Sequence, residues 1–271
     1  MVLMSGGICF KIYLRYNQHM IERVNILGVQ VSAINMEQAL GEISNWVENR
    51  SPHYVCVTPA HGIMDCQREP ELKQIFNQSG MTTPDGMSIV WLLKLLGHSH
   101  VSRVYGPDLM LAVCRYGLQS GWRHFFYGGM PGVAEALRDN LIGQFPGLKV
   151  VGYYSPPFRE VKAEEEQGII RMILEKTPDI IWVGISTPKQ EKWMAKFAHR
   201  LDTPVLIGVG AAFDFLSGKK LQAPGWVQRS GFEWLFRLLS EPGRLWKRYI
   251  RYPLFAILVF AQMLGLKRYD T

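Results

Sequence analysis

Several motifs that identify metal sites or enzyme classes are missing from this chain of 271 residues. Its four cysteines form no CxxC pair and its seven histidines form no HExxH motif, so we expect neither a disulfide framework nor a bound metal. A dinucleotide-binding GxGxxG, a P-loop GxxxxGKS/T and a nucleophile-elbow GxSxG are missing too. Without GxGxxG and its downstream acidic partner, an NAD(P)-linked oxidoreductase is a poor candidate.

The sequence also lacks a hydrophobic run long enough to span a membrane. The longest, Leu254–Leu266, has thirteen residues and is interrupted by Gln262, whereas a spanning helix needs roughly 20 apolar residues. Residues 1–22 have no basic region followed by an apolar core, so we expect a poorly ordered extension there and no signal peptide. The scattered cysteines favour a reducing cytoplasm.

Positive charge is concentrated at one end of the chain. There are 30 Lys and Arg and 23 Asp and Glu residues, and residues 219–271 hold ten of the former but three of the latter. This segment is also rich in Trp, Tyr and Phe, which suits a nucleic acid, an anionic membrane surface or a solvated helix face. The adjoining apolar run favours the membrane. We predict an α/β domain over residues 23–218 and a basic, aromatic-rich helical appendage over 219–271.

Apolar runs alternate with amphipathic stretches through the body of the chain. Strands are predicted at Val24–Val31, His53–Thr58, Met81–Thr83, His124–Tyr127, Val150–Tyr154, Ile180–Ile185 and Val205–Val209, and helices at Met36–Val47, Ser88–Leu96, Pro131–Phe145, Ala163–Glu175 and Pro188–Arg200. This order is typical of an α/β fold with a Rossmann-like, mostly parallel sheet and helices on both faces. Ligands of such sheets bind outside the carboxyl ends of the strands.

Small and polar residues follow these strands. Gly128–Gly132 forms a glycine-rich turn before a helix, which suits a phosphate or is a tight turn without a ligand. Asp85 is either a helix cap or a general base. Glu191 complements a helix dipole, while Gln190 and Lys189 have the chemistry to contact a nucleobase or sugar and a phosphate. Arg103 is a solvated loop residue or a diphosphate clamp.

Several segments occur together and in order: TPDG, RVYGPDLM, FFYGGMPGV, PDIIWVGISTPKQEKW, GVGAAFDFLSG, APGW and EWLFRLLSEPGRLWKRY. On these segments the chain, from about Val24 to Tyr252, resembles the WecG/TagA/CpsF family of bacterial glycosyltransferases (glycosyltransferase family 26), with features of its exopolysaccharide branch. Two departures are Ala60, where many members have Asn, and Gln222, where many have Arg. If that arginine neutralises a leaving group, another cation must replace it here, and Lys219, Lys220 and Arg229 are near in sequence.

The resemblance implies inverting transfer of glucose, N-acetylmannosamine or a related hexose from a UDP-sugar to a polyprenyl-diphosphate-linked glycan, without metal or other cofactor. Such a reaction serves exopolysaccharide, capsule or cell-wall polymer synthesis. The resemblance also implies that Asp85 is the base and that the family's threonine, arginine and glutamine correspond to Thr58, Arg103 and Gln190. With the strand-end residues, the predicted substrate- and nucleotide-binding set is Thr58, Arg103, Gly128, Gly129, Gly132, Lys189, Gln190, Glu191 and Asp214.

A lipid-linked acceptor gives the basic segment a role, because the enzyme must reach a glycan held at the inner face of the cell membrane. We expect a peripheral cytoplasmic protein that binds the membrane and no nucleic acid, and self-association stays open. Its predicted membrane- and acceptor-side residues are Arg229, Arg237, Arg244, Lys247, Arg248 and Arg251. The alternative is a membrane-peripheral nucleotide-binding regulator without catalysis.

Overall fold

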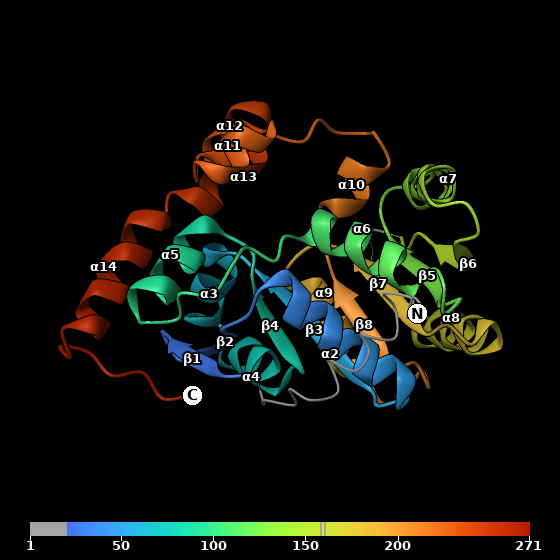
Figure 1. Ribbon diagram of the computed structural model, residues 1–271, viewed down its shortest axis with the longest axis horizontal. Coiled ribbons are helices and arrows are strands. Elements are labelled where there is room, and N and C mark those ends of the chain that lie inside the picture. Colours follow the sequence, from blue (N-terminus) through green and yellow to red (C-terminus); the bar gives the residue numbers. More distant parts are fainter. Residues whose placement is uncertain (1–20, 158, 160) are drawn as a thin grey trace, which may run out of the picture.

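A six-stranded parallel sheet forms the centre of the protein in the computed structural model, which describes residues 21–157, 159 and 161–271 (Figure 1). In spatial order its strands are β4 (Met81–Pro84), β3 (His53–Thr58), β8 (Val205–Gly208), β7 (Ile180–Gly184), β5 (Arg123–Gly128) and β6 (Lys149–Tyr154). The predicted α/β fold class is confirmed. The predicted extension over residues 1–22 lies outside the described residues, apart from Ile21 and Glu22.

Helices cover both faces of the sheet, because successive side chains of a buried strand point to opposite sides. Ile181 and Val183 face one apolar core and Ile180 and Trp182 face the other. The first core is completed by α3 (Ala60–Cys66), α4 (Pro70–Gln78), α5 (Met87–Leu95), α8 (Ala163–Lys176) and α9 (Lys189–Phe197). The second is completed by α2 (Met36–Glu48), α6 (Gly106–Gly117), α7 (Val133–Gln144) and α10 (Ala212–Leu216).

The first predicted strand, Val24–Val31, is wrong, because the chain folds there into an antiparallel hairpin of β1 (Arg23–Ile26) and β2 (Val29–Ser32). Leu27 and Gly28 both have positive φ angles, 53° and 83°, and form the two-residue turn. The Asn25 side chain stabilises this turn by accepting a hydrogen bond of 2.7 Å from the Gly28 amide. The apolar run Val24–Val31 therefore forms two short strands and a turn, and not one strand.

The C-terminal segment is helical, as predicted, and consists of α11 (Gly225–Arg229), α12 (Glu233–Ser240), α13 (Pro242–Tyr249) and α14 (Tyr252–Met263). Helices α11–α13 gather next to α5, and α14 runs from them towards the hairpin (Figure 1). There Gln262 accepts from the Leu27 amide at 2.9 Å and donates to the Asn25 carbonyl at 3.0 Å. The residue that interrupts the apolar run thus attaches α14 to the body. None of the described helices has the length and hydrophobicity that a membrane crossing requires.

Candidate active site

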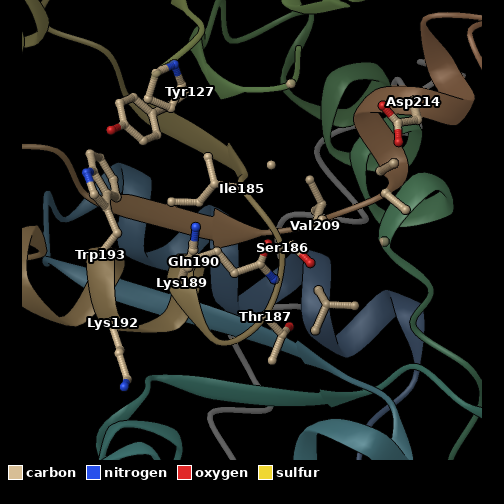
Figure 2. Close-up of a pocket in the computed structure, with 18 of the residues that line it drawn as sticks. Tyr127, Ile185, Ser186, Thr187, Lys189, Gln190, Lys192, Trp193, Val209 and Asp214 are labelled. Carbon is tan, nitrogen blue, oxygen red and sulfur yellow. The ribbon is translucent and has the colours of Figure 1, made fainter. Parts of the chain in front are cut away.

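A cavity of about 730 Å³ opens at the carboxyl ends of β3, β4, β5, β7 and β8. Figure 2 shows part of its lining, with Tyr127 and Trp193 on one side and Asp214 on the other. The rings of Tyr127 and Trp193 stack with their centroids 4.2 Å apart, so they give the cavity an aromatic wall. A second cavity of about 160 Å³ lies next to the first, and both are lined by Pro59, His61, Asp85 and Arg237.

Asp85 lies where the two cavities meet, directly after β4. Its side chain is 15% exposed, and its Oδ1 is buried without a hydrogen-bond partner among the described residues. Burial is the main reason why the pKa of Asp85 rises from 3.8 to about 6, against the lowering effect of Arg103. A carboxylate with a free acceptor oxygen and a pKa near neutrality has the properties of a general base.

Arg103 contacts Asp85 but is not free to bind an external anion as placed. Its Nε donates to the Asp85 carbonyl oxygen, while Nη2 lies 3.8 Å from Asp85 Oδ1. The same Nη2 donates to Glu233 Oε2 at 2.6 Å, and Glu233 Oε1 accepts from the Tyr105 hydroxyl at 3.0 Å. Neither Glu233 nor Tyr105 could be predicted as a site residue, since no local pattern pairs a residue in α12 with one 130 positions earlier.

Gln190 and Glu191 lie in the first turn of α9, where Gln190 lines the larger cavity and Glu191 is fully buried and lines neither cavity. Glu191 Oε1 accepts from Thr187 Oγ1 and from Gln190 Nε2, each at 3.0 Å. Burial raises the pKa of Glu191 to about 7. Because the Gln190 amide nitrogen is bound to Glu191, its Oε1 is left as a buried acceptor with no partner in the described part of the chain.

The other predicted substrate-binding residues divide into two groups. Gly129, Lys189 and Asp214 line the larger cavity, and Asp214 is paired with Lys220 at 3.0 Å. Thr58 lines neither cavity, because its hydroxyl is buried and donates to the Cys56 carbonyl at 3.1 Å. Neither cavity lining includes Gly128 or Gly132.

Those two glycines instead shape the turn after β5. A Cβ on Gly128, whose φ is +142°, would lie 2.5 Å from the Gly184 carbonyl oxygen, so this position requires glycine. Gly132 has a φ of +82° and precedes α7, which begins at Val133 and not at the expected Pro131. The turn therefore lets β5 and β7 approach each other closely at the cavity edge.

The basic residues of the C-terminal segment have different surroundings. Arg237 and Arg248 line the larger cavity, and Arg248 donates to Ser186 Oγ at 3.2 Å. Arg251 forms an ion pair with Asp65 at 2.8 Å, whereas Arg229 and Lys247 are exposed. The side chain of Arg244 is outside the described part of the structure.

Arg237 has a different position from the other basic residues of this segment. It lines both cavities, and no hydrogen bond or ion pair is formed by its guanidinium with the residues that the structure describes. Of the cations expected to replace an arginine at Gln222, Lys220 is bound by Asp214 and Glu241, and Lys219 is exposed. His61 also faces both cavities, and burial, followed by Arg248, lowers its pKa to about 3, so it is neutral.

Metal ligands do not gather in this region. Within residues 21–157, 159 and 161–271, no three His, Cys, Asp or Glu side chains lie close enough together to hold a metal ion.

Comparison with known proteins gives a consistent set of relatives. The chain is 29% identical over 206 residues to the N-acetylglucosaminyldiphosphoundecaprenol N-acetyl-beta-D-mannosaminyltransferase of Bacillus spizizenii, covering 76% of this chain and 77% of that protein. The protein of the same name from Bacillus subtilis is 28% identical over 188 residues (69% and 71%), and that from Staphylococcus aureus strain MW2 is 25% identical over 228 residues (83% and 86%).

A family model extends this similarity over nearly the whole described chain. The model of the glycosyl transferase WecG/TagA/CpsF family matches residues 24–269, which include the sheet, both cavities and helices α11–α14. The chain therefore belongs to the WecG/TagA/CpsF family of glycosyl transferases.

Proposed function

We propose that this protein transfers a sugar from a UDP-sugar to a polyprenyl-diphosphate-linked glycan with inversion at the anomeric carbon. The observation that carries the proposal is the meeting of two cavities at the carboxylate of Asp85, whose Oδ1 has no hydrogen-bond partner among the described residues. A two-substrate transfer needs such a geometry, because the acceptor hydroxyl must lie between the base and the anomeric carbon of the donor. The larger cavity has room for the nucleotide sugar and the smaller one for a single sugar ring of the acceptor.

The chemistry then follows from the charges around Asp85. The acceptor oxygen attacks the anomeric carbon and forms the new C–O bond while the bond from that carbon to the UDP oxygen breaks. Asp85 takes the proton of the acceptor hydroxyl, and the bonding electron pair leaves with UDP. Arg237 and Arg248 line the same cavity and are the cations that stabilise the charge on the departing diphosphate.

In this proposal, the names of the relatives suggest which donor and acceptor sugars to test. The named relatives are N-acetylmannosaminyltransferases that act on N-acetylglucosaminyldiphosphoundecaprenol. These names support N-acetylmannosamine as the first donor to test and N-acetylglucosamine as the first acceptor sugar. They do not support the exopolysaccharide role over cell-wall polymer synthesis, so glucose is the second donor.

The proposed acceptor also requires the enzyme to work at a membrane surface. Large apolar side chains are exposed along α14, among them Ile257 and Phe260, each 63% exposed. Trp91 on α5 and Trp246 on α13 are exposed as well, and the basic Lys247 is next to the latter. Hydrophobic insertion together with attraction to anionic lipid supports reversible, peripheral binding to the inner face of the cell membrane.

A donor screen with a synthetic polyprenyl-diphosphate N-acetylglucosamine tests the proposal. We expect UDP release and a glycosylated product with one UDP-sugar, and neither with the Asp85→Asn variant. Binding of UDP-sugar without UDP release from any donor would instead indicate a nucleotide-binding regulator.

A further inference from the structure

We propose that Glu233 is a positioning residue that holds the Arg103 guanidinium away from the Asp85 carboxylate. In this role it keeps the Asp85 oxygen available for the acceptor hydroxyl. Glu233 is the first residue of α12, whereas Asp85 and Arg103 belong to the loops after β4 and before α6. The inference rests on the proposed function, because it takes Asp85 as the base.

Three contacts fix the Arg103 guanidinium on one side of Asp85. Nε donates to the Asp85 main-chain oxygen, and the guanidinium carbon lies 3.9 Å from the centre of the Tyr105 ring. Nη2 is bound to Glu233 at 2.6 Å and is 3.8 Å from Asp85 Oδ1, beyond hydrogen-bond distance. The closer of the two carboxylates is therefore that of Glu233.

The carboxylate of Glu233 is built into this position. The residue is 8% exposed, and burying a carboxylate is costly unless both oxygens are bound. Here Oε2 accepts from Arg103 and Oε1 from the Tyr105 hydroxyl. Tyr105 thus supports the pair twice, through its ring beneath Arg103 and through its hydroxyl on Glu233.

Without the charge of Glu233, Asp85 is the nearest carboxylate to Arg103. A rotation of the Arg103 side chain that closes the 3.8 Å gap would convert a loose contact into a direct, charge-assisted pair. Asp85 would then lose basicity and its free acceptor oxygen together. Glu233 also contributes, after burial, to raising the pKa of Asp85, whereas Arg103 lowers it.

Other charged and titratable groups also influence Asp85, and the Glu233 substitution must leave them in place. Arg237 and His61 line both cavities together with Asp85. The other groups are the hydroxyls of Tyr105, Tyr249 and Tyr252. Replacing Glu233 by glutamine keeps nearly the same side-chain volume, removes the negative charge and exchanges one of the two acceptor oxygens for an NH2 donor. It therefore weakens the hold on the Arg103 guanidinium without leaving a cavity.

The test measures UDP release by the full-length protein and its Glu233→Gln variant, with the UDP-sugar and lipid acceptor on which the wild type turns over, between pH 5 and 8. We expect kcat to fall about tenfold or more, with little change in KM, and the acidic limb of the kcat profile to move to lower pH. Tyr105→Phe should change both in the same direction but less. Asp108→Asn is the matched control, since this exposed acid lies near Arg103 without bonding to it, and should change neither.

Two results would overturn the inference. If kcat falls while the acidic limb of the pH profile stays in place, Glu233 only holds α12 to the body. Thermal unfolding of the variant and the wild type is the control, because equal midpoints exclude misfolding as the cause of a lower kcat. A lower KM at unchanged kcat would mean that Glu233 competes with a substrate phosphate for Arg103. A wild type that releases no UDP with any donor refutes the proposed function itself, which keeps the two failures distinct.

Discussion

Replacing Asp85 by asparagine should abolish turnover and at the same time stabilise the folded protein at neutral pH. The reason for the second effect is that the Asp85 carboxylate is held in a largely buried position, which raises its pKa from 3.8 to about 6. A carboxylate with a raised folded-state pKa destabilises the fold whenever it is ionised. Asparagine fills nearly the same space without the charge.

The size of the effect follows from the two pKa values. One pKa unit corresponds to about 1.4 kcal/mol, so the difference between 3.8 and about 6 corresponds to roughly 3 kcal/mol. The destabilisation is complete above the folded-state pKa of about 6 and disappears as the pH falls to the unfolded-state value near 3.8. The stabilising effect of Asp85→Asn should therefore be present at about pH 8 and absent at about pH 4.

Urea or thermal unfolding at these two pH values measures the difference. At 2–4 °C per kcal/mol for a domain of this size, we expect a midpoint several degrees higher for Asp85→Asn at about pH 8. Asp139→Asn is the control, because Asp139 is exposed and paired with Arg138 at 2.7 Å, and such pairs contribute little. A gain of equal size at both pH values, or a loss at about pH 8, would refute the argument from burial.

Three further predictions concern the C-terminal segment. Arg237→Ala should lower kcat about 10- to 100-fold through loss of charge stabilisation on the leaving diphosphate, measured as UDP release; an unchanged kcat would remove Arg237 from this role. Replacing Ile257 and Phe260 by serine should weaken binding to anionic vesicles at least tenfold (about 1.4 kcal/mol) in co-sedimentation, and unchanged binding would place the docking surface elsewhere. Gln262→Ala should lower the free energy of unfolding by about 1–3 kcal/mol, because the buried Leu27 amide loses its acceptor; chemical denaturation that shows no loss would contradict this.

The sheet and the position of the site could be predicted because their signals are local. An apolar run such as Ile180–Ile185 predicts a strand, and in a parallel sheet the residues after it must lie at the common carboxyl edge. This reasoning places Asp85 and Gln190 at the cavity, as the structure does. It does not reveal which way a side chain points, so it could not tell that the Thr58 hydroxyl bonds its own strand.

Contacts between residues far apart in the chain could not be predicted from the sequence. The charge count predicts a basic C-terminal surface but does not separate Arg237, which faces the cavities, from Arg229, which is exposed. The contact of Glu233 with Arg103 depends on how α12 packs on the body, a long-range property. Gln262 looks like an interruption of an apolar helix until its hairpin partners are known.

Product analysis with both substrates present tests the central claim most directly. The protein should release UDP and extend the polyprenyl-diphosphate-linked sugar in equal amounts, with inverted anomeric configuration, when donor and acceptor are supplied together. Omitting the acceptor or replacing Asp85 by asparagine should abolish both signals. A product with retained configuration, or UDP-sugar binding with no product from any donor, would contradict the proposed reaction.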